Sequence, residues 1–206
     1  YYGNFKQKSN GIPLRTKLIA NFTYNTALSA IFPKITNFFF SNKLTSSWIK
    51  KFMGIAPKRS LPLLHKQTLR AWYNEHKKTT TPPSTKKGKV YLFCDEFTNF
   101  NDTPIGITAI KLLERLGYEV VIPRHVESGR TFMSKGMLTE ARQVAVQNVA
   151  MLKDIITEES PLIGIEPSAI LSFRDEYPSL VYETQREEAK VLAKNVLLFD
   201  EFIARE

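Results

Sequence analysis

The stretch KVYLFCDEFTNFNDTPIGITAIKLLERLGYEVVIP (residues 89–123) decides the fold class. Its start, KVYLFC (89–94), is a short apolar run typical of a strand buried on both faces. Asp102 or Thr103 can cap a helix that has Pro104 in its first turn and apolar residues at helical spacing up to Gly117. The run YEVVIP (118–123) follows as a second strand. The stretch therefore predicts a βαβ unit with a right-handed crossover.

The residues after this unit continue the alternation of helix and strand. A longer helix is predicted from about Ser134 to Ile156, a third strand at PLIGI (161–165), and a short helix around 169–177. We therefore predict a Rossmann-like α/β domain over 89–182, built on a small parallel βαβ sheet. Residues 183–206 predict a C-terminal helix. Because the chain starts without Met and ends in a helical pattern, we expect it to be a piece of a larger protein.

Charge divides the chain into two parts. Residues 1–89 hold 17 lysines and arginines against one acidic residue, Glu75, whereas residues 90–206 hold 12 basic and 19 acidic residues. Residues 1–75 are predicted to be an all-α basic connector with helices over 14–32, 46–55 and 61–73, the first of them stopped by Pro33. Residues 76–88, rich in Thr, Pro and Lys, are predicted to be an exposed linker.

The basic connector allows three interpretations. It can be a helical collar on the rest of a larger protein, a membrane-surface anchor, or a nucleic-acid surface. The absence of a nucleic-acid-binding motif makes the last the least favoured. We expect Lys50, Lys51, Lys58 and Arg59 on one exposed face, suited to an anionic membrane surface. The single cysteine excludes an internal disulfide and fits a reducing compartment, so we expect a cytoplasmic location, peripheral at the inner face of the membrane if lipid is bound.

Three loops follow the predicted strands, at 94–102, 124–130 and 166–169. In an open parallel sheet such loops converge on one crevice. The spacing of their polar residues fits no familiar zinc or EF-hand pattern, so no metal site is predicted, although a non-sulfur metal or an anion at Arg130 remains an alternative. The sequence identifies no catalytic residue. The crevice candidates are Cys94, Asp95, Glu96, His125, Glu127, Ser128, Arg130 and Glu166.

The motifs LFCDEFTNF (92–100), ESGR (127–130) and PLIGIEPSAILSFRDEY (161–177) resemble a known family. They are similar to the cysteine-rich CCG domain in the C-terminal region of FAD-linked oxidases, which are iron–sulfur oxidoreductases of the D-lactate or glycolate dehydrogenase type. The resemblance covers residues 88–182 and extends more weakly over 10–75. It implies that the chain holds a helical connector and the first of two cysteine-rich halves.

The chain departs from the family at the cluster ligands. The family's Cys-Cys-Gly-Arg reads Glu127-Ser128-Gly129-Arg130 here, its Glu-Pro-Ser-Cys ends in Ala169, and Glu96 stands where many members place a cysteine. These groups hold iron–sulfur clusters poorly. The resemblance thus implies the frame of a cluster site without its ligands. The residues of the frame that remain include Gly129, Arg130, Glu166, Pro167 and Arg174, and the last of these is a further crevice candidate.

The resemblance also implies a function. We expect a fragment of an FAD-linked iron–sulfur oxidoreductase that oxidises a small 2-hydroxy acid such as lactate or glycolate. The fragment itself would hold no cofactor and be inactive alone, with a structural, docking or electron-transfer-scaffold role. FAD and the clusters would lie in its partners, the upstream FAD and ferredoxin-type domains and the missing second CCG half. The alternative is a stand-alone basic adaptor that binds acidic partners or nucleic acid.

Overall fold

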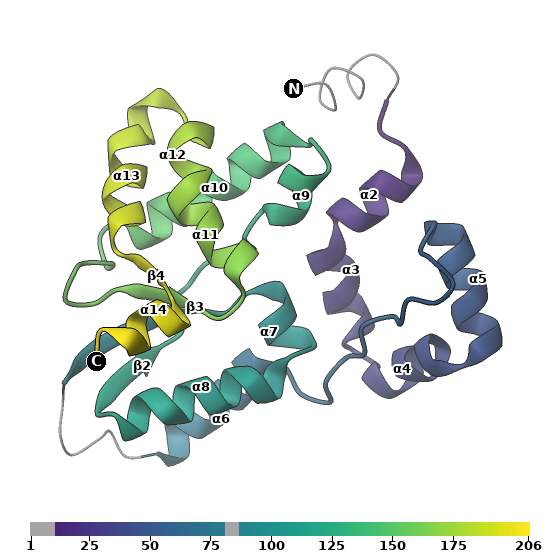
Figure 1. The fold of residues 1–206 in the computed structure, drawn as a ribbon, viewed down its shortest axis with the longest axis horizontal. Helices are drawn as coiled ribbons and strands as arrows, with labels where there is room; N and C mark the ends of the chain where they lie inside the picture. The colour runs from purple at the N-terminus through teal and green to yellow at the C-terminus, as the bar shows by residue number, and fades with distance from the viewer. Residues whose placement is uncertain (1–10, 81–86) are drawn as a thin grey trace.

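The computed structural model describes residues 11–80 and 87–206, and its centre is a parallel four-stranded sheet (Figure 1). The strands are β1 (Gly88–Phe93), β2 (Tyr118–Val121), β3 (Leu162–Gly164) and β4 (Val196–Leu198), and their order in the sheet is β2-β1-β3-β4. The chain moves from β1 to β2 on one side and then to β3 on the other. The sheet therefore has a switch point between β1 and β3, which is where open α/β sheets place their functional crevice.

Helices cover both faces of the sheet, so the fold is α/β as predicted (Figure 1). Alternate residues of β1 point to opposite faces, as the period of a strand requires. Phe93 packs in a core cluster with residues of α10 (Leu138–Leu152), α11 (Pro167–Asp175) and α13 (Arg186–Lys194). Leu92 packs in a second cluster with residues of α6 (Leu69–Thr79) and α8 (Thr103–Arg115).

The predicted β1, α8, β2 and β3 are present within three residues of their expected limits, but the segments after β1 and β2 differ. Residues 94–102, expected as a loop, contain the short helix α7 (Glu96–Phe100). The helix expected from about Ser134 begins at Leu138 as α10, and a separate short helix, α9 (Arg130–Ser134), precedes it. Gly136, at φ 70°, adopts the left-handed conformation between them that only glycine takes up at little cost.

The C-terminal segment corrects the prediction of a single helix over 183–206. It folds as a 3₁₀ turn (Glu183–Gln185), α13, β4 and α14 (Phe199–Ala204), after the short helix α12 (Tyr177–Leu180). Strand β4 pairs with β3 in parallel, and Val196 and Leu192 belong to the core. The sheet-forming unit therefore continues past residue 182 to the end of the chain.

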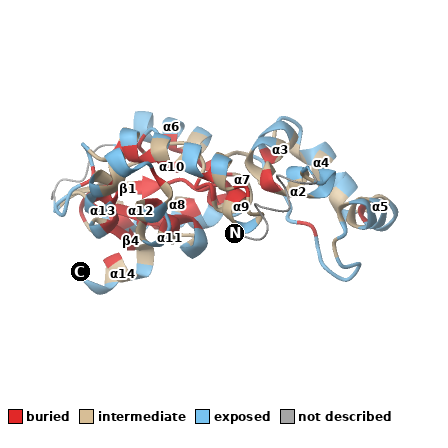
Figure 2. Cartoon of the chain, turned by 90° about the horizontal axis from the view of Figure 1, so that it is seen from above, coloured by how far each residue is buried: buried red, intermediate tan, exposed pale blue. Residues whose placement is uncertain are grey.

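The basic segment is helical, as predicted, with different limits (Figure 2). The expected helix over 14–32 is broken at Asn21 into α2 (Leu14–Ala20) and α3 (Phe22–Ser29), and Pro33 begins α4 (Pro33–Ser41) instead of only ending its predecessor. Helix α5 (Lys43–Met53) corresponds to the helix expected over 46–55 and ends at Gly54. No helix of the described residues is long and apolar enough to cross a membrane.

Helix α6 corrects the predicted boundary at residue 75. The helix runs to Thr79, and its Leu69 and Tyr73 are buried in the core of the α/β domain, where the Tyr73 hydroxyl donates a hydrogen bond of 2.9 Å to the Val120 carbonyl. The last helix of the basic segment is thus part of the α/β domain. Of the predicted linker 76–88, residues 81–86 lie outside the described part of the chain.

Candidate functional site

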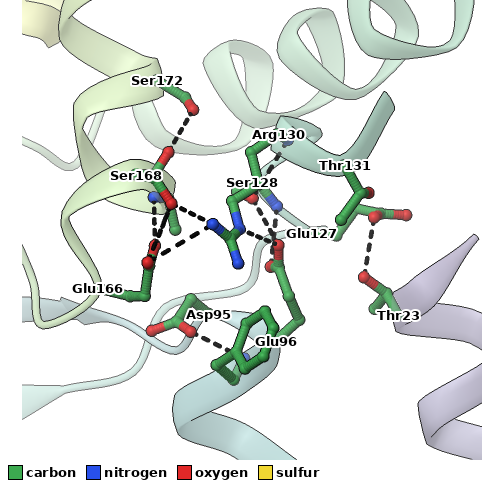
Figure 3. A network of polar contacts seen from close by, with 12 residues as sticks. Thr23, Asp95, Glu96, Glu127, Ser128, Arg130, Thr131, Glu166, Ser168 and Ser172 are labelled. Atoms are coloured by element: carbon green, nitrogen blue, oxygen red, sulfur yellow. Dashed lines mark hydrogen bonds and ion pairs between the residues drawn. The ribbon is translucent and has the colours of Figure 1, made fainter. Parts of the chain in front are cut away.

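The loops after β1, β2 and β3 meet at the switch point of the sheet, as the sequence predicts (Figure 3). Asp95 caps α7 by accepting hydrogen bonds of 2.9 Å from the amides of Phe97 and Thr98. This cap starts the helix immediately after β1 and places the next residue, Glu96, inside the crevice. The side chain of Glu96 is completely buried.

Arg130 is the centre of a polar network that joins the three loops (Figure 3). The Ser128 hydroxyl donates a 2.8 Å hydrogen bond to Glu96, and Arg130 Nε lies 3.4 Å from the same carboxylate oxygen, Oε1. Arg130 Nη1 lies 3.5 Å from Glu166 Oε1 and donates to the Ser168 hydroxyl, which in turn contacts the Glu166 carboxylate at 2.8 and 2.9 Å. Arg130 therefore braces the second loop against Glu166 and Ser168 of the third loop.

Two carboxyl groups at the edge of this network have raised pKa values. Burial is the main cause at Asp95, where it raises the pKa to about 6, and the neighbouring Glu96 adds to it. Burial also raises the pKa of Glu127, whose carboxylate accepts a 2.9 Å hydrogen bond from the Thr23 hydroxyl on α3. Glu127 therefore connects the basic helical segment to the crevice.

His125 and Cys94 lie in the crevice wall and have structural partners. Because the Val126 carbonyl can only accept, His125 Nδ1 carries the proton and donates to it at 2.7 Å. The bare Nε2 then accepts from the Cys94 amide at 3.2 Å and from Arg70 at 2.5 Å. Burial, followed by the charge of Arg70, lowers the His125 pKa to about 3, and burial raises the pKa of the Cys94 thiol to about 12. The arrangement holds both as neutral groups at physiological pH.

Arg174, a crevice candidate from the resemblance, does not join this network in the described part of the chain. Its guanidinium forms two-pronged contacts of 2.9 to 3.3 Å with Glu201 of α14. Glu201 also accepts from the Leu198 amide at 2.9 Å, which closes the turn after β4. Arg174 therefore fixes the C-terminal helix α14 and not the three loops that Arg130 joins.

Two buried polar residues outside the predicted crevice set hold the second loop in place. Asn148 of α10 accepts from the Val126 amide at 3.0 Å and donates to the Glu127 carbonyl at 2.8 Å. The Tyr177 hydroxyl accepts from Asn148 and donates to the Ser128 carbonyl, both at 2.9 Å. An amide on the inner face of an otherwise apolar helix is the signal that could have identified Asn148, since a buried amide requires partners.

A cavity of about 570 Å³ opens beside Arg130, between the basic helices and the α/β domain. Phe97 forms part of its wall, with the Arg130 guanidinium 4.8 Å from its ring centroid on one side and Phe22 stacked on it at 4.8 Å. Because Glu96 and Glu166 flank the guanidinium, its charge is largely compensated. The cavity is therefore poorly suited to a simple anion.

The donor atoms of the crevice do not fit an iron–sulfur cluster or a zinc ion. Cluster ligation normally requires four thiolates, and the one thiol of the chain is buried, with a raised pKa, and lies 3.5 Å from the Asn99 side-chain oxygen. Within the described residues, no group of three or more His, Cys, Asp or Glu side chains is arranged to hold a metal ion. The crevice is built as a network of hydrogen bonds and ion pairs.

Curated relatives cover almost the whole chain. It is 27% identical over 199 residues, 93% of its length, to D-2-hydroxyglutarate dehydrogenase of Pantoea ananatis, and 27% identical over 200 residues to that of Escherichia coli K12. The chain resembles dehydrogenases along nearly its entire length. It is also 25% identical over 170 residues to one subunit of the anaerobic glycerol-3-phosphate dehydrogenase of Escherichia coli K12.

The chain is much shorter than these relatives. It spans about a fifth of the length of the two D-2-hydroxyglutarate dehydrogenases and 42% of the glycerol-3-phosphate dehydrogenase polypeptide. No known family profile and no solved structure matches it. The matched relatives are named as dehydrogenases, and the chain corresponds to one portion of such proteins.

Proposed function

We propose that the chain is a cluster-free structural and docking domain of a larger FAD-linked, iron–sulfur oxidoreductase that oxidises a small 2-hydroxy acid. Its similarity to D-2-hydroxyglutarate dehydrogenases supports both the class of reaction and the class of substrate. FAD, the clusters and the reacting substrate would be bound by other parts of that protein. This chain would hold the parts together through its crevice network and its basic helices.

One observation carries the docking role. The positions at which the resembling family places cluster cysteines are connected here by direct protein contacts. Ser128 bonds to Glu96 of the first loop, Glu127 bonds to Thr23 of α3, and Arg130 lies 3.5 Å from Glu166 of the third loop. Glu166 also accepts a 2.7 Å hydrogen bond from the amide of Ala169. Side-chain contacts thus hold the three loops together in the place where the family binds a cluster. Glu127 extends this connection to a separate helical segment.

Adding cysteines at the four family positions tests the proposal that this chain binds no iron–sulfur cluster. The 206-residue chain should stay colourless after anaerobic incubation with iron and sulfide followed by desalting. The fourfold variant E96C/E127C/S128C/A169C should gain broad visible absorbance that survives desalting, because it returns four thiolates to one crevice. The matched control places the first three cysteines but keeps Ala169. A stable colour in the unchanged chain would refute the proposal, and a colourless fourfold variant would refute the assignment of the cluster frame.

The parent activity has its own test. The complete polypeptide that contains this chain should carry FAD and reduce an artificial dye with D-2-hydroxyglutarate, D-lactate or glycolate as electron donor. Glycerol 3-phosphate is the matched comparison, because the other named relatives act in its oxidation. Turnover with glycerol 3-phosphate alone would overturn the proposed substrate class, and a complete polypeptide without flavin would overturn the proposed FAD-linked chemistry.

A basic adaptor is the second candidate, and the exposed charge of the helical segment favours it. Lys51, Lys58 and Arg59 are exposed as predicted, whereas Lys50 is half-buried and donates to the Pro57 carbonyl at 3.2 Å. An adaptor for nucleic acid should bind duplex DNA or single-stranded RNA with a steep dependence on salt. Fluorescence anisotropy with both probes at two salt concentrations distinguishes it from the oxidoreductase domain, for which no such binding is expected.

A further inference from the structure

The helical segment 11–63 leaves most of its apolar side chains uncovered (Figure 2). Twelve large apolar residues between Leu14 and Leu63 are exposed, against five in the rest of the described chain. The buried apolar residues of the segment are Ala20, which packs against α10, and Leu61. Helices this short are not stable without burying an apolar face, so this surface is expected to be covered in the working protein.

The uncovered side chains form a groove. A cavity of about 740 Å³ lies between α2–α3 on one side and α5 on the other, with residues 59–64 along its edge. Trp48 and Phe52, one turn apart on α5, line it, and their exposed fractions are 76% and 68%. Phe22 and Ile19 line the opposite wall. The groove is therefore apolar along both walls.

We propose that this groove binds an amphipathic helix whose polar face is acidic, supplied by a part of the oxidoreductase that lies outside this chain. The shape favours a helix because apolar residues on two facing walls can enclose a rod, whereas a bilayer surface needs an outward-facing apolar surface. Charge favours an acidic partner, since residues 11–63 hold eight lysines and arginines and no acidic residue, and Arg59 lies in the groove lining.

The relatives of this chain are long enough to supply such a helix from another part of the same polypeptide. The D-2-hydroxyglutarate dehydrogenases that match 93% of this chain contain about four fifths of their residues outside the matched part. The proposal deepens the docking role proposed above and names the surface involved. Because the iron–sulfide test depends on the crevice residues and not on the groove, failure of one proposal can be told from failure of the other.

Trp48 provides a direct measurement of groove occupancy. Substitution W72F in the 206-residue chain leaves Trp48 as the single indole. The probe is a peptide of about 18 residues, long enough to form a helix, with leucines at positions i, i+3, i+4 and i+7 and glutamates and alanines elsewhere. Its addition should shift the Trp48 emission to shorter wavelength in a saturable way, because the exposed indole becomes buried. A peptide with lysine in place of each glutamate should bind at least about tenfold more weakly.

Two substitutions on α5 separate the groove from the general surface. F52E places a carboxylate in the groove wall and should weaken binding of the acidic peptide at least about tenfold. L44E is the matched control, because Leu44 is 76% exposed on the same helix but does not line the groove, and it should change binding by less than about threefold. Circular dichroism of each variant shows that the helices remain folded.

Four outcomes would overturn the proposal. The first is that the Trp48 emission does not shift with peptide up to about millimolar concentration, and the second is that F52E and L44E weaken peptide binding equally. The third is an emission shift that depends on protein concentration without peptide, which would indicate self-association through the groove. The fourth is a shift with vesicles of phosphatidylserine and phosphatidylcholine, but not with the acidic peptide. That result would assign the surface to an anionic membrane instead.

Discussion

At the scale of single residues, the crevice depends on the balance between one guanidinium and several carboxylates. Glu96 has no exposed side-chain surface, and its charged partner is Arg130. A buried carboxylate that loses its cation keeps the full cost of leaving water, so breaking such a pair is far more costly than breaking a surface pair. Arg130 is therefore the residue on which the three loops depend.

Arg130→Ala should lower the free energy of unfolding by about 3 kcal/mol, measured by urea denaturation, because it leaves Glu96 buried without a cation. The double variant E96Q/R130A should recover part of this loss, since the uncompensated charge is then gone. Arg174→Ala is the matched control. Its pair with Glu201 is partly exposed on both sides, so it should cost at most about 1 kcal/mol. Equal losses for R130A and R174A would contradict this account of the crevice.

Asp95 makes stability depend on pH in an unusual direction. Its pKa is about 6 in the folded protein, against a reference value of 3.8, because burial disfavours the charged form. The folded state thus holds the proton more tightly than the unfolded chain, and the stability from this group is lost as pH rises from about 4 through 6. Asp95→Asn keeps an oxygen for the helix cap and cannot titrate.

The D95N variant should therefore be more stable than the natural chain at pH 7.5, by an amount on the order of 2 to 3 kcal/mol, and this gain should disappear between pH 6 and pH 4. His125 acts in the opposite direction, since its folded pKa of about 3 makes the unfolded chain take up the proton first. Both proteins contain His125, so its contribution cancels in the difference. A difference in melting temperature that is the same at every pH would contradict the prediction.

At the scale of elements, the sequence predicts the features that follow from long apolar patterns. Buried strands such as β1 and an amphipathic helix such as α8 are visible as periodicity. Strand β4 was missed because its three residues, Val196 to Leu198, lie between two helical patterns, and only pairing with β3 makes them a strand. Helix α7 was missed because its five residues are too few to display a period.

The candidate site follows the same rule. The three loops and the contact between Arg130 and Glu166 could be anticipated, because parallel strands bring their carboxyl ends together. Thr23 could not, since it reaches Glu127 across 104 positions of sequence and from another segment. The partner of Arg174 could not be anticipated either, because Glu201 belongs to helix α14, which had been expected as part of one long helix.

The bond between Thr23 and Glu127 should hold α3 on the α/β domain. Thr23→Val removes the donor but keeps the shape, and a lost hydrogen bond to a carboxylate is worth about 1.5 to 3 kcal/mol. Amide hydrogen exchange in α2 and α3 should therefore quicken by about tenfold or more, while exchange in β1 stays unchanged. Thr108→Val is the matched control, because its hydroxyl bonds the Pro104 carbonyl within α8. Unchanged exchange in α3 would mean that the Phe22–Phe97 stack alone holds the helix.

At the scale of the whole molecule, the basic segment contains two different structures. Residues 11–63 have little core of their own, whereas α6 places Leu69 and Tyr73 in the core beneath the sheet. The amide of His65 also donates a 2.7 Å hydrogen bond to the Phe100 carbonyl at the end of α7. The change in net charge near residue 89 thus does not coincide with the boundary between packed structures, because charge describes the surface of a helix and not what its apolar side contacts.

The position of that boundary gives a last prediction. A shortened chain of residues 65–206 should unfold in one cooperative thermal transition, because it keeps α6, all four strands and α14.

The chain 89–182, the domain expected from sequence, should fail to fold. It lacks β4, which leaves the edge of β3 open, and it lacks Leu69, Leu192, Val196 and Phe202, all buried in the two main core clusters. Large-to-small changes at single core positions already cost about 2 to 5 kcal/mol, so removing four such side chains together exceeds the stability of a small domain. Circular dichroism melts of both chains measure this difference, and a cooperative transition in 89–182 would show that α6 and β4 are additions to an independent core.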